Sequence, residues 1–252
     1  MPRTDRRHLT LLDAHYGGDV SRVVMAGAFH VPGDSAREKR DWLQEHGDAL
    51  RRLLLYPPYG DPSMCVNLIV DSSIPEAPFG YVIMEAMGYP HFSGSNSICV
   101  VTALLETGRI PLGPPGDQEV LLEAPIGAVR AVAHHDGSEV HGVTLDADPA
   151  WVAARGLTAH LPSYGDVTFD LVWSGCYYAV VDAEVHGFAI SEAERSVMAS
   201  FANELCLTAH DLDLTHPDYG DTGPLSFVAL AGPLATDLED GVPRAGARRP
   251  RG

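Results

Sequence analysis

The sequence feature that most constrains the fold is a turn of small polar residues that starts at His91 and runs directly into an apolar helix. Ser95, Asn96 or Ser97 can serve as the N-cap, because each side-chain oxygen can accept a hydrogen bond from an amide of the first turn. Gly108 stands where a left-handed C-terminal cap is common. The interior positions are apolar apart from one threonine, so no face suits water. We therefore predict that this helix lies inside a core.

The N-terminus of this helix is the candidate functional site. Its first-turn amides and its dipole would attract a carboxylate or a phosphate, and Gly94 would let such a ligand approach the backbone closely. Ser93 and Ser95 flank that glycine. The alternative interpretation is a capped core helix that binds nothing. The pattern alone favours this alternative.

Length, charge and hydrophobicity restrict the class of protein. With 252 residues and 45% hydrophobic content, the chain can bury a core as one large domain or as two smaller ones. The formal net charge of -17 argues against a nucleic-acid partner, which would require clustered Lys and Arg. No apolar run approaches the roughly 20 residues that span a bilayer, and no secretory signal follows the charged N-terminus. We therefore expect no membrane partner and a cytoplasmic location.

Cysteines and histidines form no recognisable metal or disulfide pattern. The four cysteines are widely spaced and include no Cys-x-x-Cys pair, so each is expected to fill a core or sheet position as a small hydrophobe. The 12 histidines are scattered and include no His-x-x-x-His pair. We therefore expect no metal site. The cysteines are Cys65, Cys99, Cys176 and Cys206.

The rest of the pattern predicts a mixed chain of helices and strands. Ser35 and Glu38 form a capping box that is followed by leucines at helical spacing, so residues 35–55 are predicted to form an amphipathic helix. A second amphipathic helix is predicted to begin at Ser191. Beyond the central helix the short strands favour an antiparallel barrel or sandwich. Strands are predicted within 9–24, as a pair around a glycine turn, and at 66–70, 79–84, 119–123, 127–133, 139–145, 166–173, 177–181 and 225–230.

Several short motifs between Leu9 and Pro233 together carry a resemblance to a known family. They are Asp13-Ala-His15-Tyr-Gly-Gly18 with Arg22-Val-Val, the helix Glu38 to Leu55 ending in Tyr-Pro-Pro-Tyr-Gly60, Ser93-Gly-Ser-Asn-Ser-Ile-Cys closing with Leu-Glu106-Thr-Gly108, Glu123-Ala-Pro125-Ile-Gly127, Trp173-Ser-Gly175-Cys-Tyr-Tyr-Ala179, and His216-Pro217. On these motifs the chain resembles the proline racemase family, which also contains hydroxyproline epimerases and trans-3-hydroxy-L-proline dehydratases.

The resemblance implies an α+β fold like that of diaminopimelate epimerase, with two pseudo-symmetric halves that are each a β-sheet or barrel around a central helix. In this fold the substrate carboxylate lies at the helix N-termini, and one residue from each half faces Cα. We expect a first half at 1–125 with its central helix at 95–107, and a second half at 126–235. Residues 236–252 are expected to form a disordered basic tail.

The sequence departs from the family pattern at the site and near its C-terminus. Ser93 stands where the first catalytic cysteine usually is, Ser95 where a ligand-binding histidine is common, and Tyr59 where an arginine is typical. The family's Asp-Arg-Ser-Pro-Cys-Gly-Thr-Gly-like motif carries the second catalytic cysteine, a substrate-binding aspartate and the second central helix. This motif has no counterpart in the sequence. We therefore expect a C-terminally truncated member whose second half lacks its central helix.

The resemblance implies a cofactor-independent racemase or epimerase acting at Cα of proline or hydroxyproline. The Cα proton is very weakly acidic, so such a site must combine a well-placed base with electrostatic stabilisation of the carbanion. A hydroxyl is a much poorer base than a thiolate unless a neighbour activates it. The catalytic candidate is Ser93, and the substrate-binding candidates are Gly94, Ser95 and Asn96.

Two alternative functions stay open. A trans-3-hydroxy-L-proline dehydratase removes one α proton and the β-hydroxyl, so it could use a single strong base. A catalytically inactive or truncated relative would at most bind the substrate carboxylate. The expected partners are the small-molecule substrate, proline or hydroxyproline, and a second copy of the chain in a homodimer. No cofactor and no nucleic acid are expected.

Overall fold

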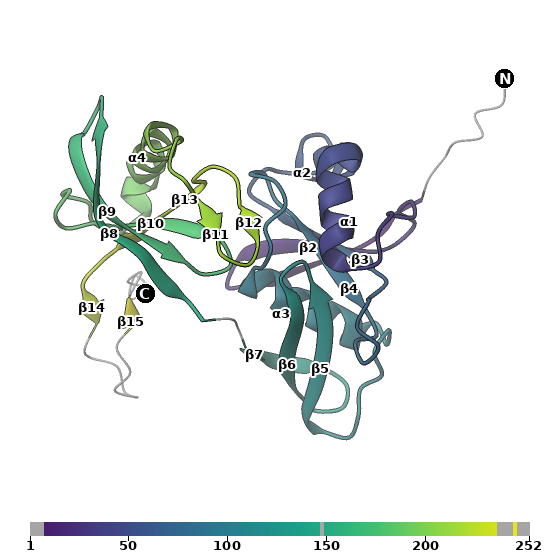
Figure 1. Cartoon of the computed structure of the whole chain (residues 1–252). Coiled ribbons are helices and arrows are strands. Elements are labelled where there is room, and N and C mark those ends of the chain that lie inside the picture. The colour runs from purple at the N-terminus through teal and green to yellow at the C-terminus, as the bar shows by residue number, and fades with distance from the viewer. Residues whose placement is uncertain (1–7, 147–148, 236–243, 246–252) are drawn as a thin grey trace. The chain divides into compact units, whose positions relative to one another are not determined.

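The structure, a computed structural model, describes residues 8–146, 149–235 and 244–245 (Figure 1). The chain divides into two compact units, Met1–Asp148 and Pro149–Gly252, which are described separately. Within the described ranges, no helix has both the length and the hydrophobicity needed to cross a membrane.

The first unit is built on a seven-stranded sheet whose strands lie in sequence order. Its elements are β1 (Thr10–Tyr16), β2 (Asp19–Ala26), α1 (Ala36–Trp42), a π-helical turn (Leu43–Gly47), α2 (Ala49–Leu55), β3 (Cys65–Val70), β4 (Gly80–Met84), α3 (Gly94–Glu106), β5 (Gly116–Ala124), β6 (Gly127–His135) and β7 (Val140–Asp146). The pairs β2–β3 and β4–β5 are parallel, and the other neighbours are antiparallel. Each parallel pair is connected through helices, because parallel strands need a long crossover.

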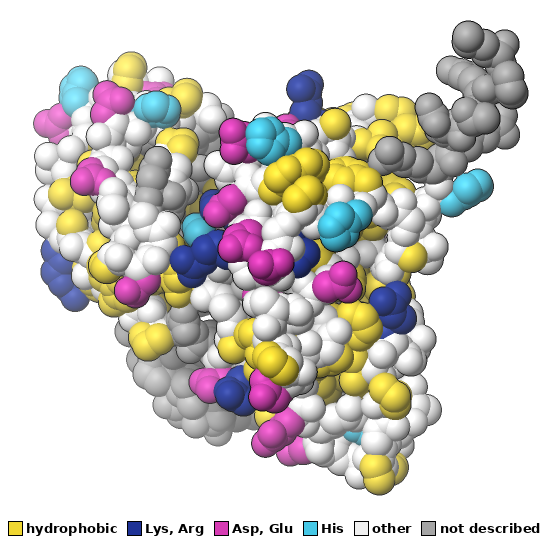
Figure 2. Space-filling view, turned by 45° about the vertical axis from the view of Figure 1, so that its right-hand side comes forward, with side chains coloured by type: hydrophobic (Ala, Val, Ile, Leu, Met, Phe, Trp, Pro, Cys, Tyr) yellow, Lys and Arg dark blue, Asp and Glu magenta, His cyan; other side chains and the backbone are white. Residues whose placement is uncertain are grey.

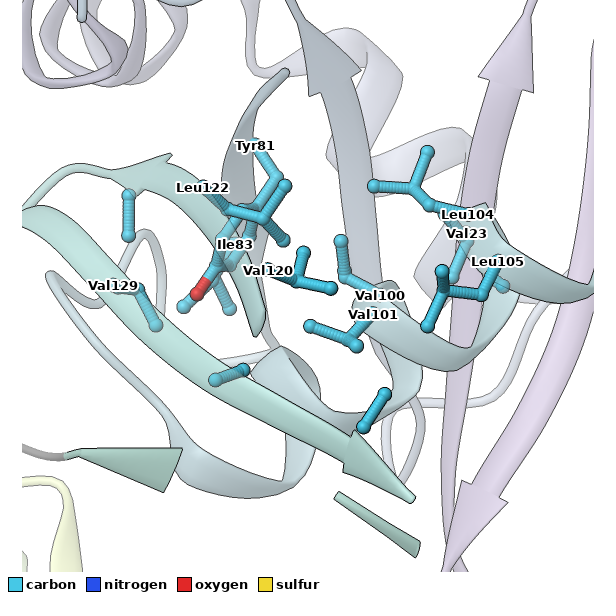
Figure 3. Close-up of a cluster of buried hydrophobic side chains, with 14 of the residues drawn as sticks. Val23, Tyr81, Ile83, Val100, Val101, Leu104, Leu105, Val120, Leu122 and Val129 are labelled. Atoms are coloured by element: carbon cyan, nitrogen blue, oxygen red, sulfur yellow. The ribbon is translucent and has the colours of Figure 1, made fainter. Parts of the chain in front are cut away.

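Helix α3 is buried against one face of this sheet, as its apolar pattern predicted. Its apolar residues from Cys99 to Leu105 are at most 2% exposed. Thr102, the single polar residue among them, satisfies its hydroxyl by donating to the carbonyl of Ile98 at 2.9 Å. Figure 3 shows α3 side chains packed among side chains of the sheet. The labelled residues are Val100, Val101, Leu104 and Leu105 of α3, and Val23, Tyr81, Ile83, Val120, Leu122 and Val129 of the strands.

Helices α1 and α2 cover the strands from the opposite side. Successive strand residues point to opposite faces, so Val23 packs with α3 while Val24 belongs to a separate buried cluster that contains Leu43, Leu54 and Leu55. The predicted capping box is confirmed: Ser35 Oγ accepts from the amide of Glu38 at 3.2 Å, and the Glu38 carboxylate accepts from the amide of Ser35 at 3.4 Å. The predicted helix over 35–55 is present, but the π-helical turn divides it.

The second unit is built on a four-stranded sheet. Its elements are β8 (Trp151–Leu161), β9 (Gly165–Trp173), β10 (Tyr177–Asp182), a 3-10 turn (Glu192–Glu194), α4 (Arg195–Thr208), β11 (Thr215–His216), β12 (Gly220–Asp221), β13 (Phe227–Ala231), β14 (Leu234–Ala235) and β15 (Arg244–Ala245). The sheet order is β13-β10-β9-β8, with β10 and β13 parallel and α4 between them in the chain. Helix α4 packs into the buried cluster of this unit through Phe201 and Leu205, both 0% exposed.

The two units repeat one arrangement of elements. In the first, the hairpin β1–β2 is followed by helices and then by β3, which is parallel to β2. In the second, the hairpin β9–β10 is followed by α4 and then by β13, which is parallel to β10. The first unit continues with β4 and α3. In the second unit, the part of the chain that the structure describes contains no helix after β13. The chain therefore has the expected α+β architecture of two similar halves, and the described second half lacks a counterpart of α3.

The compact units divide at a different place from the predicted halves. A boundary between residues 125 and 126 falls in the turn of the β5–β6 hairpin, whereas the units divide after Asp148. The difference arises because β6 and β7 continue the first sheet. The predicted tail, 236–252, lies outside the described residues apart from 244–245.

Candidate active site

Ser93 is the N-cap of α3, so the helix begins one residue before the predicted start at 95. Ser93 has extended backbone angles, φ -153° and ψ 125°, and its carbonyl accepts the first helical hydrogen bond from the amide of Ser97 at 3.0 Å. Its side chain makes no capping hydrogen bond. Within the described part of the chain, the amides of Gly94, Ser95 and Asn96 have no hydrogen-bond partner. These unpaired first-turn donors and the positive end of the helix dipole are suited to bind an anion.

The side chain of Asn96 is the centre of a buried polar network beneath this helix end. Asn96 is 0% exposed, and its carboxamide makes four hydrogen bonds. Its Oδ1 accepts from Ser21 Oγ at 3.1 Å and from Asn67 Nδ2 at 2.7 Å. Its Nδ2 donates to Glu85 Oε1 and to Ser93 Oγ, both at 2.9 Å. The carboxamide is therefore saturated and connects strands β2 and β3, and the residue after β4, to Ser93.

Glu85 and Cys65 form the other side of the network. Glu85 follows β4, and Cys65 Sγ lies 3.5 Å from its Oε1. Burial raises the pKa of the Glu85 carboxyl above its usual range. Burial, with the nearby carboxylates of Glu85 and Asp19, raises the pKa of the Cys65 thiol to about 12. Cys65 is therefore a protonated thiol at neutral pH and not a thiolate base.

Ser95 connects the helix end to a second carboxylate. Its Oγ donates to Asp19 Oδ2 at 2.8 Å, and Asp19 Oδ1 lies 4.0 Å from Cys65 Sγ. Ser93 Oγ is 3.4 Å from Ser95 Oγ, which is at the outer limit of a hydroxyl hydrogen bond. Asp19 is exposed. The helix N-terminus is thus flanked by two carboxylates, one exposed and one half-buried.

The environment of the Ser93 hydroxyl suits a proton donor better than a general base. Across the described ranges, no imidazole, thiol or carboxylate hydrogen-bonds Ser93 Oγ, so no neighbour activates it as a base. The side-chain Nδ2 of Asn96 donates to this oxygen and would stabilise negative charge on it. The described residues contain no group of three or more His, Cys, Asp or Glu that could hold a metal ion. Asp and Glu side chains are spread over the face shown in Figure 2, in keeping with the net charge of -17.

The structure places the four predicted site residues together at the start of α3, and it adds residues that the sequence reasoning missed. The missed residues come from the first strands of the sheet and from the end of β4. For Ser21 and Asn67 the available signal was a polar residue at a buried position within a strand. Tyr59 is 66% exposed, and its carbonyl accepts from Arg22 Nη1 at 2.7 Å. The missed residues are Asp19, Ser21, Cys65, Asn67 and Glu85.

Comparison with known proteins identifies what the chain is similar to. The sequence model of a family described as proline racemase matches residues 11–243. A protein of Chromohalobacter salexigens is 42% identical over 90% of this chain and 63% of its own length. A 4-hydroxyproline 2-epimerase of Agrobacterium fabrum is 32% identical over 88% of this chain and 65% of its own length. A trans-3-hydroxy-L-proline dehydratase of Burkholderia ambifaria is 29% identical over 84% of this chain and 63% of its own length.

A solved structure gives the same result. The crystal structure of a hydroxyproline epimerase from Agrobacterium vitis with bound trans-4-hydroxy-L-proline matches with a TM-score of 0.81 and 31% identity, over 93% of this chain and 68% of that one. The chain therefore spans between 63% and 65% of the length of the three relatives compared above.

Proposed function

Because the chain belongs to the proline racemase family, we propose that its first unit carries part of an active site for cofactor-independent chemistry at Cα of proline or hydroxyproline. The observation that carries the proposal is the N-terminus of α3, where three unpaired amides lie next to the Ser93 hydroxyl. A hydroxyproline epimerase that is 31% identical to the chain has bound trans-4-hydroxy-L-proline, which supports this substrate class.

In this proposal the substrate carboxylate accepts hydrogen bonds from the amides of Gly94, Ser95 and Asn96. A carboxylate fits this position because it neutralises the positive helix end and satisfies the first-turn donors. Asn96 contributes its backbone N–H only, because its side chain is saturated by protein partners. Ser95 already donates its hydroxyl to Asp19, so its amide is the group available to the substrate.

Ser93 acts in this proposal as a proton donor at one face of Cα. When its O–H bond breaks, the proton goes to the Cα carbanion and the electron pair stays on Oγ. The Asn96 N–H that already points at Oγ then stabilises the alkoxide. Removal of the α proton from the opposite face requires a second group, which the proposal does not assign to a residue of the described chain.

A dehydratase acting on trans-3-hydroxy-L-proline is the second candidate. The Ser93 hydroxyl supports this candidate as well as the first. Its proton can be transferred to the β-hydroxyl as that group leaves, which converts a poor leaving group into water. The similarity to a trans-3-hydroxy-L-proline dehydratase supports this candidate as well. A relative that binds the carboxylate but turns over no substrate is the third candidate.

The test is incubation of the purified chain in D2O with L-proline, trans-4-hydroxy-L-proline and trans-3-hydroxy-L-proline in separate reactions. NMR measures deuterium at Cα, and chiral chromatography separates epimer from dehydration product. Deuterium and epimer from the first two substrates support the racemase or epimerase. Dehydration of the third substrate alone rejects it in favour of the dehydratase. If no substrate exchanges its α proton while one binds in calorimetry, the inactive relative is correct.

A pair of serine variants assigns any activity to the α3 site. Ser93→Ala removes the proposed proton donor and is expected to lower exchange by at least 100-fold, in line with the roughly 10²- to 10⁴-fold contribution of acid–base groups. Ser200→Ala removes an exposed hydroxyl on α4 that bonds only to its own helix, and it should leave exchange unchanged. Equal activity in the two variants would contradict the role of Ser93. The homodimer and the cytoplasmic location stay predictions.

A further inference from the structure

The orientation of the Asn96 carboxamide is fixed by its neighbours. Rotation by 180° would place its carbonyl against the Glu85 carboxylate and its N–H groups against the Asn67 N–H group. Both contacts would be repulsive, because each would pair two acceptors or two donors. In the observed orientation both N–H groups have acceptors and the carbonyl has two donors. Glu85 contributes most to the energy difference between the observed and the rotated carboxamide, because an ionised carboxylate can only accept hydrogen bonds.

Glu85 is held in place by contacts with Asn96 and Cys65. Its Oε1 receives Asn96 Nδ2 at 2.9 Å and lies 3.5 Å from Cys65 Sγ of β3. The other charged group that acts on it is Asp19 at the start of β2. Helix α3 presents Ser93, Ser95 and Asn96 to this region, none of which is charged, and its Cys99 thiol, whose pKa burial raises, interacts with Ser21 and Asp19. Glu85 is therefore the one titratable carboxyl that hydrogen-bonds Asn96 among the described residues.

We infer that Glu85 is a positioning residue for Ser93: its carboxylate holds the Asn96 carboxamide so that Nδ2 donates to Ser93 Oγ and the Ser93 proton stays free for the substrate. This inference rests on the proposed function of Ser93 as a proton donor. Among the described residues, Glu85 hydrogen-bonds neither Ser93 nor the backbone amides of the helix. It acts only through Asn96.

Protonation of Glu85 reverses the direction of the hydrogen bonds. A protonated carboxyl can donate through its O–H as well as accept, so it removes the penalty that the ionised carboxylate sets on the rotated carboxamide, and the contact with the Asn67 N–H group is then what still opposes rotation. In the rotated molecules Ser93 donates its own proton to Asn96 Oδ1, and the proton is not available to a substrate. Activity is therefore expected to be highest when Glu85 is ionised. It should fall as the pH is lowered through the pKa of this carboxyl, which burial places above the usual range for glutamate.

The first measurement follows the Asn96 side-chain amide directly by ¹⁵N NMR of the full chain, with the signal assigned by its loss in Asn96→Ser. In the unmodified chain we expect this signal to shift with pH in a single titration. Glu85→Gln should abolish the titration, because glutamine accepts through its carbonyl at every pH. Asp117→Asn, which neutralises an exposed carboxylate beside His134, should leave the titration intact. A signal that does not titrate, or that titrates equally in Glu85→Gln, would overturn the inference.

The second measurement is the pH profile of α-proton exchange. Glu85→Leu should lower the rate by about 10- to 100-fold, the usual effect of removing a supporting outer contact at a functional site. Glu85→Gln should recover most of the rate and lose the acidic limb of the profile. A purely structural role would predict parallel losses in both variants and no change in the shape of the profile. If the unmodified chain exchanges no substrate, the proposed function fails, while the NMR titration still decides whether Glu85 sets the orientation of Asn96.

Discussion

Replacing Asn96 with alanine should destabilise the first unit far more than its single small side chain suggests. The substitution removes four hydrogen bonds, but their partners differ in burial. Glu85 and Ser93 are half-exposed, so water can replace the lost contact. Ser21 and Asn67, at 2% and 0% exposed, have no access to water. They bond to each other at 2.6 Å, which leaves about one buried group without its partner.

The expected magnitude follows from that count. One buried polar group left without a partner costs roughly 1–3 kcal/mol, and the exchange of Asn96's contacts to Glu85 and Ser93 for water adds about 1 kcal/mol in net hydrogen-bond free energy. Alanine recovers about 0.5 kcal/mol through its higher helix propensity. We therefore expect Asn96→Ala to lower the free energy of unfolding by about 1.5–3.5 kcal/mol.

The assay must report on the first unit alone. Hydrogen exchange of the α3 amides, followed by mass spectrometry of a peptide over 94–106, gives the free energy of opening in that unit. Asn203→Ala is the matched control, because Asn203 is an exposed residue of α4 and the same chemical change should cost less than about 0.5 kcal/mol. Equal effects of the two substitutions would refute the reasoning that the Asn96 network is buried and saturated.

Three further predictions follow from the site and from the caps. Ser93→Cys places a thiol where Asn96 and the helix dipole lower its pKa, so iodoacetamide should modify this thiol at pH 7.5. Cys65, with its pKa raised to about 12, should stay unmodified. Equal labelling of the two cysteines would contradict this prediction. The pKa of Glu85 is raised in the folded state, so its contribution to stability is present below the pKa of the unfolded chain and is lost as the pH rises through the folded value. Glu85→Gln should therefore melt at a higher temperature than the unmodified chain at pH 8, and the difference should shrink at pH 4; a constant difference would count against the burial of this charge. Ser35→Ala removes the capping box of α1 and should cost about 1 kcal/mol in urea unfolding, whereas Ser226→Ala, which removes an exposed hydroxyl in a loop, should cost almost nothing.

The pattern at α3 was sufficient to predict a buried helix, because burial on every side leaves a direct record in the sequence, whereas its role as a functional site stays a prediction. The predicted limits, 95–107, differ from the observed 94–106 by one residue, since Ser93 rather than a later polar residue is the N-cap. The rest of the site could not be predicted from one sequence. Glu85, Asn67 and Ser21 lie 11, 29 and 75 positions from Asn96, and only the sheet order brings them together.

Two other differences have local physical causes. Strand β8 was not predicted, because it is an edge strand with most of its side chains exposed and therefore has no regular alternation of apolar residues. The helix over 35–55 was predicted as continuous, but Leu43 and Gly47 bound a π-helical turn that the spacing of leucines does not reveal. Residue propensities describe the helix on either side of that turn and carry no information about the extra residue within it.

Helix α3 packs against strands that precede it in the sequence and strands that follow it, and this has a consequence for protein synthesis. Its apolar residues pack with Val23 of β2, which precedes the helix, and with Val120 and Val129 of β5 and β6, which follow it. During translation the helix therefore emerges from the ribosome before the strands that supply these later partners. Until the β5–β6 hairpin has been made, the part of the α3 surface that packs against this hairpin stays uncovered, and the nascent chain is then exposed to aggregation or chaperone capture.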